Sequence, residues 1–334
     1  MFEKGGNHII ELKNLAIGHQ KEEALLKDIS LSVHPGEMVA LIGRNGTGKS
    51  TLLKSMLGLI PLIQGVCYLD GALFDTYDLR DRARKVSFVS SHLSQLPSIS
   101  VKELVSLGRM PFTGFMGRLT AQDHEFIDKS LMEVGLSSFA ERKLEHLSDG
   151  ERQRTMIARA LAQDTPLMVL DEPTAFLDIP NKNELIQLLG GFRDSGKSIV
   201  YSTHDLDTAM HYADKIWVIH QGEILEGAPE DLGISGLFDT LFERSGIRYD
   251  LASKRFKYST LPKGSIRLEG EKGVPYEWTR NALERLGYEV DNSGSTVVKL
   301  DNPDGVNRWM LYQSDQSKVF DNLYNLARFL NKDV

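Results

Sequence analysis

The sequence reads Gly43-Arg44-Asn45-Gly46-Thr47-Gly48-Lys49-Ser50-Thr51 directly after the apolar run Met38-Val39-Ala40-Leu41-Ile42. Its spacing, G-x-x-x-x-G-K-[ST], is typical of a loop that wraps around the phosphates of a nucleotide. Glycines let backbone N–H groups and the end of the next helix face phosphate oxygens, Lys49 supplies positive charge to the outer phosphates, and Ser50 can bind Mg²⁺. A glycine-rich turn before an ordinary helix is the alternative, which the strand-like run in front disfavours.

Two carboxylates follow another apolar run much further along the chain. Asp171 and Glu172 come directly after Leu167-Met168-Val169-Leu170, and open α/β sheets form their ligand crevice where such buried strands end. We expect Asp171 to bind Mg²⁺, directly or through water. Glu172 is placed to orient or deprotonate the water that attacks the γ-phosphate of ATP. An acid pair that caps the next helix is the alternative interpretation.

The composition is that of an ordinary globular protein. The chain has 334 residues, of which 41% are hydrophobic and 25% charged, and its formal net charge is -7. Such a chain has no overall basic field to hold nucleic acid, so we expect no nucleic acid partner. The N-terminus is too polar for a secretory signal, and no apolar stretch reaches the roughly 20 residues that cross a bilayer. Any membrane role is expected to come through a partner.

Short apolar runs alternate with helix-like stretches over most of the chain, which predicts an α/β fold. Strand candidates are residues 38–42, 86–89, 167–170, 198–201 and 216–219. Between about residues 97 and 165 helical spacing takes over, Thr120 and Asp123 resemble a capping box, and Gly135 ends that run. We interpret this region as a helical subdomain inserted into the α/β core of a first domain, residues 1–247.

The character of the sequence changes near residue 248. Residues 248–334 hold short alternating runs between breaks that contain Gly, Ser and Asp, which predicts a small α+β domain. One helix is expected to start near Pro275 and to stop at Gly287. Another is expected to carry on one face Val319, Phe320, Leu323, Leu326, Ala327 and Leu330. The role of this domain stays open, and regulation or stabilisation of a dimer are the hypotheses.

Three further segments make the sequence resemble the ABC ATPase family. Leu147-Ser148-Asp149-Gly150-Glu151-Arg152-Gln153 is similar to the family signature, usually L-S-G-G-Q, with two substitutions. Ala175-Phe176-Leu177-Asp178 stands in the place of the family's D-loop, and His204 follows a strand candidate, as the family's switch histidine does. The resemblance covers roughly residues 9–247. It implies a P-loop ABC ATPase core with a mixed, mostly parallel sheet and an inserted helical subdomain.

The resemblance also implies roles for single residues in a homodimer that holds ATP between two copies. Ser148, the backbone of Gly150 and the helix after them would contact the γ-phosphate bound by the other copy. His204 would contact the γ-phosphate and hold the attacking water, and Asp178 would pass information between the two sites. ATP and Mg²⁺ are the implied cofactors.

Two positions depart from the family's pattern. The family usually has a glutamine after the strand that corresponds to residues 87–89, where it contacts Mg²⁺ or water; Ser91 falls at that place, with Gln95 as a weaker substitute. A serine hydroxyl reaches less far, so its metal contact is expected to be water-mediated or absent. The family's adenine-stacking aromatic is often a tyrosine after the first strand, and His19 lies nearest to that place. An imidazole can stack on adenine, and a simple surface loop is the alternative.

Residues 103–111 and 174–178 are most similar to ATPases of bacterial importers for iron-siderophores, haem and cobalamin. The implied function is ATP hydrolysis that energises metal-chelate uptake through integral membrane permease subunits, with a substrate-binding protein as an indirect partner. The implied location is peripheral, on the cytoplasmic face of the bacterial inner membrane. The cargo contacts the partners, so this sequence does not name it.

An ABC protein that acts as a clamp without a permease, in DNA repair, chromosome organisation or translation, is the alternative. Repair and chromosome clamps carry a long coiled-coil insertion, whereas the stretch between Lys49 and Leu147 is short and has no sustained heptads. Translation-type members usually hold two cassettes in one chain, and this chain has one. A P-loop kinase would use the same phosphate loop but gives no account of residues 147–153.

Overall fold

The computed structural model describes residues 8–18, 23–90, 98–114, 116–242, 247–250, 255–258, 263–302, 305–313 and 316–331. The chain divides into two compact units, Met1–Leu232 and Gly233–Val334. The sequence places the boundary at residue 247, whereas the contacts group helix α9 (Leu237–Phe242) with the second unit. Among the described residues, no helix combines the length and the apolar composition that a membrane span requires.

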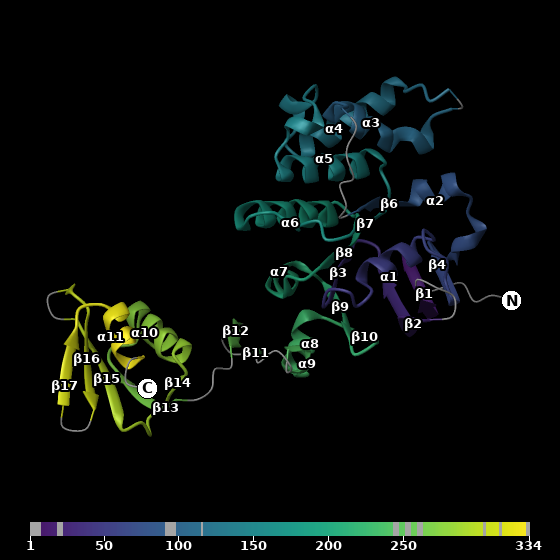
Figure 1. Cartoon of the computed structure of the whole chain (residues 1–334). Coiled ribbons are helices and arrows are strands. Elements are labelled where there is room, and N and C mark those ends of the chain that lie inside the picture. Colours follow the sequence, from purple (N-terminus) through teal and green to yellow (C-terminus); the bar gives the residue numbers. More distant parts are fainter. Residues whose placement is uncertain are drawn as a thin grey trace. The chain divides into compact units, whose positions relative to one another are not determined.

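The first unit is built around a mixed sheet whose order, in the described residues, is β10-β9-β3-β8-β7-β6 (Figure 1). β10 runs antiparallel to β9, and the other neighbours are parallel. Every residue of β3, β7 and β8 is buried, as apolar strands are when both faces of a sheet are covered. The strands are β3 (Met38–Gly43), β6 (Val86–Val89), β7 (Leu167–Leu170), β8 (Ser198–Thr203), β9 (Lys215–His220) and β10 (Glu223–Gly227).

A second, antiparallel sheet has the order β2-β1-β4-β5. Ile10 and Leu12 of β1 share one apolar core with Leu41 of β3 and Trp217 of β9. The sequence pattern alone does not predict these strands, because register shifts around Asn14, which has a φ of 50°, interrupt the alternation of β1. The strands are β1 (Ile10–Ile17), β2 (Leu26–Val33), β4 (Gln64–Leu69) and β5 (Ala72–Leu73).

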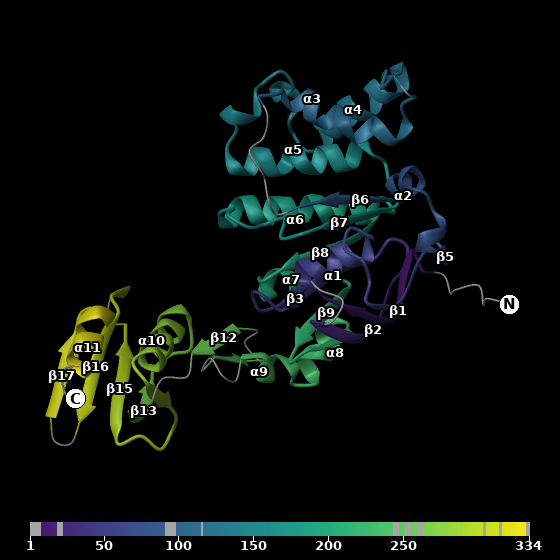
Figure 2. The same ribbon diagram turned by 45° about the vertical axis from the view of Figure 1, so that its right-hand side comes forward.

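Helices cover the main sheet and form the inserted subdomain, in which α3, α4 and α5 lie side by side (Figures 1 and 2). The α-helices are α1 (Lys49–Met56), α2 (Leu79–Lys85), α3 (Val101–Ser106), α4 (Ala121–Glu133), α5 (Asp149–Ala162), α6 (Ile179–Asp194), α7 (Leu206–Tyr212) and α8 (Pro229–Ile234). The 3-10 helices are η1 (Phe74–Thr76), η2 (Leu107–Phe112), η3 (Ser137–Phe139) and η4 (Leu144–His146).

The predicted start of α4 is confirmed by its cap. The side chain of Thr120 accepts a hydrogen bond from the N–H of Asp123, and the Asp123 carboxylate accepts one from the N–H of Thr120. At the other end Gly135 takes a φ of 73°, a left-handed conformation that glycine adopts without strain. Both ends of the helix therefore follow from local sequence.

Arg109 is the polar centre of the helical subdomain. Its side chain is 5% exposed, and its Nε donates to Oδ1 of Asp123 at 2.8 Å. Its Nη1 donates to the carbonyl of Ala162 at 2.8 Å, and the rings of Phe112 and Phe126 lie 4.0 and 4.2 Å from the guanidinium carbon. One buried cation thus joins η2, α4 and the end of α5.

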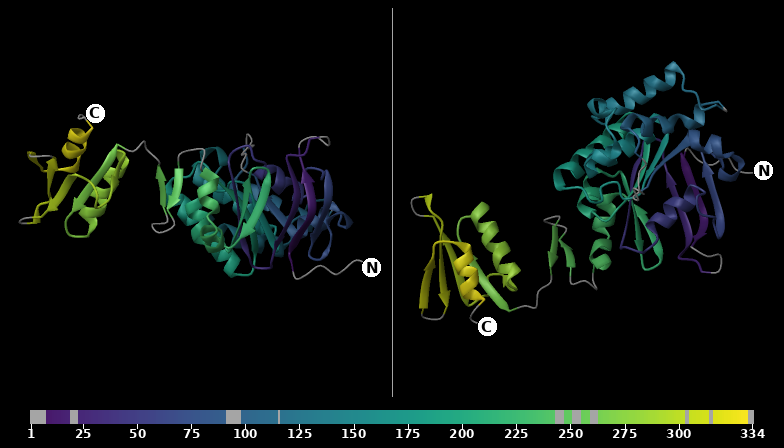
Figure 3. Two further views of the ribbon diagram at one scale, coloured as in Figure 1. Left: turned by 90° about the horizontal axis from the view of Figure 1, so that it is seen from below. Right: turned by 45° about the horizontal axis from the view of Figure 1, so that its top comes forward.

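The second unit contains a five-stranded sheet, in the described residues, with the order β14-β13-β15-β16-β17 (Figure 3). Helices α10 and α11 pack on one face, where Leu283 and Leu326 join Val298 and Trp309 in a single core. The elements are β13 (Gly264–Glu269), α10 (Val274–Arg285), β14 (Tyr288–Val290), β15 (Thr296–Asp301), β16 (Arg308–Gln313), β17 (Gln316–Phe320) and α11 (Leu323–Leu330). A hairpin of β11 (Ile247–Asp250) and β12 (Arg255–Tyr258) precedes them.

One of the two predicted helices of this unit needs correction. The helix expected near Pro275 is α10, but the prediction that Val319 and Phe320 begin the last helix is wrong. Both residues belong to β17, and α11 starts after Asn322, whose side chain accepts a hydrogen bond from the N–H of Asn325. The strand end and the helix face the same core, which imitates helical spacing in the sequence. The predicted fold class, an α/β core plus a small α+β domain, is confirmed.

Replacing Arg109 by alanine is expected to lower the free energy of unfolding by about 3–5 kcal/mol, because Asp123 loses its buried charged partner. The measurement is urea unfolding of the full chain at neutral pH. Lys102→Ala is the control, since the Lys102–Asp128 pair lies at the surface and exposed pairs contribute about 0–1 kcal/mol. Equal losses for the two variants would contradict a central role for Arg109.

The same pair predicts a loss of stability in acid. The N–H of Thr120 is the main cause that lowers the pKa of Asp123 to about 2, with its hydroxyl and Arg109 contributing in the same direction. A carboxyl group whose pKa is depressed by folding stabilises the fold above its unfolded pKa, near 4. That contribution is lost as the pH falls from about 4 to about 2, and Arg109→Ala is expected to flatten the loss.

Candidate functional site

The phosphate-binding loop predicted from the sequence connects β3 to α1. Gly48 precedes the helix with a φ of 106°, a left-handed conformation that side chains rarely allow. A Cβ at Gly43 would lie 2.7 Å from Oγ1 of Thr47, so the loop also closes too tightly for a side chain there. The first turn of α1 contains no acidic residue. The positive end of this helix is therefore available to an anion.

Lys49 lies inside the curl of this loop. Its side chain is 5% exposed, and its Nζ donates to the carbonyl of Gly43 at 2.9 Å and to that of Arg44 at 3.4 Å. The ammonium group also lies 3.4 Å from Oε1 of Glu172. A buried ammonium held by backbone carbonyls is a fixed positive charge beside the loop, as phosphate binding requires.

Asp171 joins three elements at the carboxyl edge of the sheet. Its Oδ1 accepts hydrogen bonds from Oγ of Ser50 at 2.9 Å and from Oγ of Ser202 at 2.7 Å. Ser50 belongs to α1, Asp171 follows β7, and Ser202 lies in β8. The carboxylate is only 1% exposed. The parallel order β3-β8-β7 brings these groups together although they are far apart in the sequence.

Glu172 occupies a strained backbone position directly after Asp171. Its φ is 48°, a conformation that residues other than glycine seldom adopt, and its N–H donates to Oγ of Ser202 at 2.8 Å. Its carboxylate lies between Lys49 and His204, with Oε2 at 3.8 Å from Nδ1 of the histidine. The carboxylate is 25% exposed and the histidine 55%. Both groups therefore reach solvent at the mouth of the phosphate loop.

This geometry fits a nucleotide with its magnesium ion. Mg²⁺ is usually held by one or two carboxylates, hydroxyl groups and substrate phosphates rather than by an all-protein cage. Oγ of Ser50 and Oδ1 of Asp171 are two adjacent oxygens of this kind. Among the described residues, no group of three or more His, Cys, Asp or Glu side chains is suited to a metal. The donors present suit an ion that the substrate phosphates share.

The other predicted site residues form a second cluster around the start of α5 and α6. Ser148 caps α5, and Asp178 caps α6 by accepting hydrogen bonds from the N–H and side chain of Asn181. A Cβ at Gly150 would lie 3.6 Å from Oδ1 of Asn181, so the two helix starts are neighbours. In the described part of the chain, no hydrogen bond or ion pair connects Ser148, Gly150 or Asp178 to the phosphate loop.

Two predicted site residues, His19 and Ser91, lie outside the described residues, as does Gln95. Their expected contacts with adenine and with the metal stay predictions. Sequence reasoning missed Ser202, which bonds both carboxylate residues of the site. The only local signal was that Ser202 stands two residues before His204. The sequence of a strand does not tell which residues of the neighbouring strands a side chain will contact.

The second cluster also presents apolar side chains to solvent. Phe176 is 90% exposed with a φ of 63°, and Ile179 is 82% exposed. A bulky residue in a left-handed conformation is uncommon, and such positions gather where a surface is shaped for a partner. The two residues lie on either side of Asp178 in the sequence, so they stand beside the second cluster.

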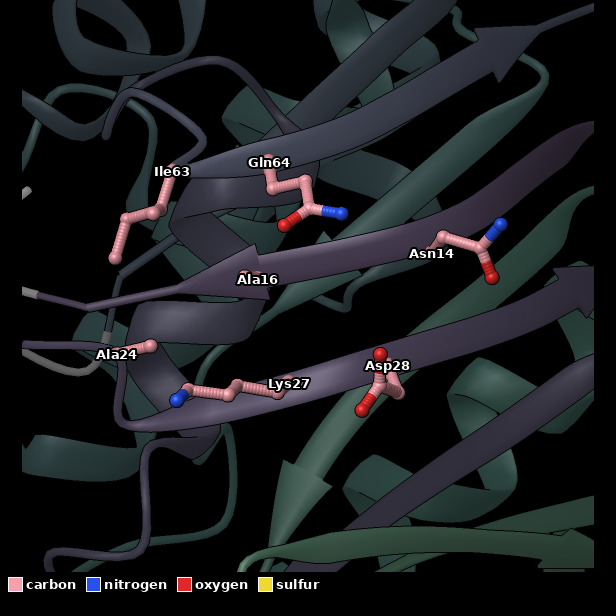
Figure 4. Close-up of a pocket in the computed structure, with 7 residues that line it drawn as sticks. All are labelled: Asn14, Ala16, Ala24, Lys27, Asp28, Ile63 and Gln64. Atoms are coloured by element: carbon pink, nitrogen blue, oxygen red, sulfur yellow. The ribbon is translucent and has the colours of Figure 1, made fainter.

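A separate pocket of about 270 Å³ opens on the antiparallel sheet (Figure 4). Figure 4 shows Asn14 on β1 and Asp28 on β2, two residues with a positive φ. None of the described site residues lines this pocket. It is lined by Asn14, Ala16, Ala24, Lys27, Asp28, Ile63 and Gln64.

Comparisons with known proteins agree with this geometry. The family model described as ABC transporter matches residues 26–175, and the model described as Iron ABC transporter C-terminal domain matches residues 263–331. The chain is 34% identical to the petrobactin import ATP-binding protein FpuC of Bacillus anthracis over 75% of its own length and 92% of that protein. It is 35% identical to the iron(3+)-hydroxamate import ATP-binding protein FhuC of Bacillus subtilis, over 65% and 81% of the two chains.

Solved structures of ABC transporter cassettes are also similar to this chain. The bacterial ABC transporter cassette MJ0796 in its dimeric form has a TM-score of 0.59 and 30% identity, over 66% of this chain and 98% of that one. A dimeric post-hydrolysis state of MJ0796 with ADP and Pi bound has a TM-score of 0.58 over the same shares of the two chains.

Ser202→Ala is expected to lower the rate of ATP hydrolysis by about 10- to 100-fold, because supporting hydrogen bonds of this kind orient metal ligands and reacting groups. The bond to Asp171 and the bond to the N–H of Glu172 are lost together. The measurement is the steady-state rate of ATP hydrolysis as a function of Mg²⁺ concentration. The Mg²⁺ concentration that gives half of the maximal rate should also rise. Ser198→Ala in the same strand is the control, since Ser198 bonds the loop near Gly36. Equal hydrolysis rates for Ser202→Ala and Ser198→Ala would show that Ser202 does not support the site.

Proposed function

Because this chain belongs to the family of ABC transporter ATP-binding proteins, we propose that it hydrolyses ATP to drive uptake of an iron chelate through a separate membrane permease. The observation that carries the catalytic part is the meeting of Lys49, Ser50, Asp171, Glu172 and His204 at one edge of the sheet. Positive charge, oxygen ligands for a metal and a carboxylate for water are all present there.

The residues of this edge divide the reaction between them. Lys49 and the N–H groups at the start of α1 bind the outer phosphates. Ser50 and Asp171 would hold Mg²⁺, which would neutralise charge on the phosphates. Glu172 exchanges its contact with Lys49 for the attacking water and orients it or accepts its proton, while His204 holds the γ-phosphate and the water from the outer side.

Hydrolysis requires a second copy of the chain. The second cluster carries the serine hydroxyl and helix start that a γ-phosphate would need, and its separation from the phosphate loop supports pairing between copies. We place Ser148 and Gly150 of one copy against the nucleotide held by the loop of the other, with Asp178 beside both. Burial of the exposed Phe176 and Ile179 would add apolar area to this interface. The dimeric cassettes among the solved relatives support the arrangement.

The cargo assignment rests on two independent similarities. The import proteins FpuC and FhuC are named for petrobactin and for iron(3+)-hydroxamate, and the second of these is an iron chelate. The separate match of residues 263–331 to an iron transporter C-terminal domain supports the same class of cargo. We therefore place the protein at the cytoplasmic face of a bacterial cell membrane, where a permease and an iron-chelate binding protein complete the importer.

A candidate surface for the permease lies where α2 and η2 meet. Leu79, Met110 and Phe112 are 83%, 62% and 36% exposed. Arg84 fixes the two elements together, since its Nε donates to the carbonyl of Pro111 at 3.1 Å and its guanidinium lies 5.4 Å from the ring of Phe112. We call these three apolar residues, which belong to two elements in contact with each other, the η2 patch. We propose that the permease covers it, because large exposed apolar side chains on neighbouring elements are candidates for a contact site.

Glu172→Gln is expected to slow ATP hydrolysis by about 100-fold or more and to trap an ATP-loaded dimer. The amide keeps the shape and the nucleotide contacts of the site but accepts no proton from water. The measurements are the hydrolysis rate and the mass in solution with and without ATP. Glu133→Gln, an exposed glutamate of α4 paired with Lys129, is the control. Parental hydrolysis by Glu172→Gln would rule it out as the catalytic carboxylate.

The cargo is tested in cells that lack the native protein. Wild-type protein should restore uptake of a radiolabelled ferric chelate, and the Glu172→Gln variant should not. Labelled cobalamin serves as the competing cargo. Restored cobalamin uptake without ferric chelate uptake would leave the ATPase assignment standing and overturn the iron assignment.

Met110→Glu is expected to reduce co-purification with the permease by about tenfold or more, because a charge is placed in the η2 patch. ATP-dependent dimerisation of the isolated chain should stay at the parental level. Met132→Glu is the matched control, since Met132 on α4 is 66% exposed and lies outside the patch. The patch is excluded as the permease contact if the two variants co-purify equally well.

A further inference from the structure

We propose that Glu151 acts as an internal competitor for the γ-phosphate, so that this chain needs more ATP to close its dimer than a neutral residue at this position would require. The signature turn, residues 147–152, would contact the nucleotide of the second copy. The carboxylate of Glu151 holds the Ser148 hydroxyl, one of the donors that this contact uses. The inference rests on the proposed head-to-tail dimer and deepens it.

The first argument is the hydrogen bonding of Ser148. Its N–H and its Oγ both donate to Oε2 of Glu151, at 2.7 and 2.9 Å, and its Oγ accepts from the N–H of Glu151 at 3.3 Å. The backbone N–H of Ser148, followed by its hydroxyl, lowers the pKa of Glu151, so the group is a carboxylate at neutral pH. A phosphate oxygen that approaches the hydroxyl must therefore displace a charged acceptor already in place.

The second argument is the difference between the two helix starts that would meet at one nucleotide. The first turn of α1 contains no acidic residue, whereas the first turn of α5 contains Asp149 and Glu151. Negative charge in the first turn satisfies the positive end of a helix. The phosphate loop thus offers an open anion site, and the signature turn offers one that the chain's own carboxylates already use.

Nearby cations do not remove this competition. The closest atoms of Arg142 and Glu151 are 3.7 Å apart, and the Arg142 guanidinium also lies 5.2 Å from the ring of Phe139. Asp149 pairs with Arg152 at 3.5 Å, while Arg152 donates further hydrogen bonds to the carbonyls of Leu144 and Glu145. Arg142 lies beyond hydrogen-bond distance of Glu151, and in the described residues no arginine donates to Oε2, the oxygen that accepts from Ser148. A phosphate must therefore still displace this carboxylate oxygen from the Ser148 donors.

A homodimer contains two signature turns. The unfavourable effect of the Glu151 charge on phosphate binding is therefore counted twice. A single charge at a helix start changes an equilibrium by roughly 2- to 5-fold, which gives about 4- to 25-fold for the pair. Glutamine is the informative replacement, because Ser-x-x-Gln forms the same capping box without the charge. Loss of the charge is thus separated from loss of the cap.

The test compares full-length Glu172→Gln protein with the Glu172→Gln/Glu151→Gln double variant. The ATP concentration that converts half of the protein to dimer is measured by sedimentation, at low and at high salt. Because two ATP molecules bind per dimer, the ATP concentration at the half-point varies as the inverse square root of the equilibrium constant for dimer formation, so the double variant is expected to need about 2- to 5-fold less ATP at low salt. The difference should shrink at high salt because charge repulsion is screened. A purely structural role of Glu151 would give no such salt dependence.

Glu172→Gln/Glu133→Gln is the control for removal of a negative charge elsewhere in the helical subdomain, and it should match Glu172→Gln. If Glu172→Gln forms an ATP-dependent dimer and Glu151→Gln leaves the half-point unchanged or raises it, the competitor role of Glu151 is overturned while the dimer stands. If Glu172→Gln forms no ATP-dependent dimer, even with its permease present, the proposed function and this inference fall together.

Discussion

The carboxylate of Asp171 is the interaction on which the rest of the first unit depends. One buried oxygen accepts hydrogen bonds from the hydroxyl groups of Ser50 and Ser202 and so holds α1, β7 and β8 at a common point. A buried carboxylate is costly unless its hydrogen bonds are satisfied, so this arrangement tolerates little displacement of any strand. Ser202 also holds the strained turn at Glu172, because its hydroxyl accepts a hydrogen bond from the N–H of Glu172. The parallel sheet thus sets the distance between the phosphate loop and the carboxylate of Glu172.

The two clusters of the first unit differ in charge and in the availability of their hydrogen-bond donors. The phosphate loop gathers positive charge and open backbone donors, while the signature turn carries a serine and a helix start but satisfies them with its own glutamate. This difference between the two clusters is the physical basis of the proposed dimer, in which each nucleotide would lie between the two.

The helical subdomain and the second unit show how much of the architecture lies beyond the catalytic edge. Arg109 stands between two aromatic rings and one buried aspartate, so the subdomain has a rigid polar centre of its own. The second unit has an independent core under its sheet, in which Trp309 donates a hydrogen bond to the hydroxyl of Thr279. Its residues 263–331 match the model described as Iron ABC transporter C-terminal domain.

The sequence by itself determined the phosphate loop, the buried strands around it, the start of α4 at Thr120 and the acids after β7, because each depends on neighbouring residues whose backbone and side-chain chemistry act locally. It failed for β1, where bulges hide the alternation, and for the start of α11, where a strand and a helix share one core. Only the tertiary structure decided that Ser202 bonds Asp171, that Lys49 meets Glu172 and that Arg109 is buried against Asp123. These contacts follow from strand order and packing, since residues 14 to 123 positions apart meet only after the sheet and the helices have assembled.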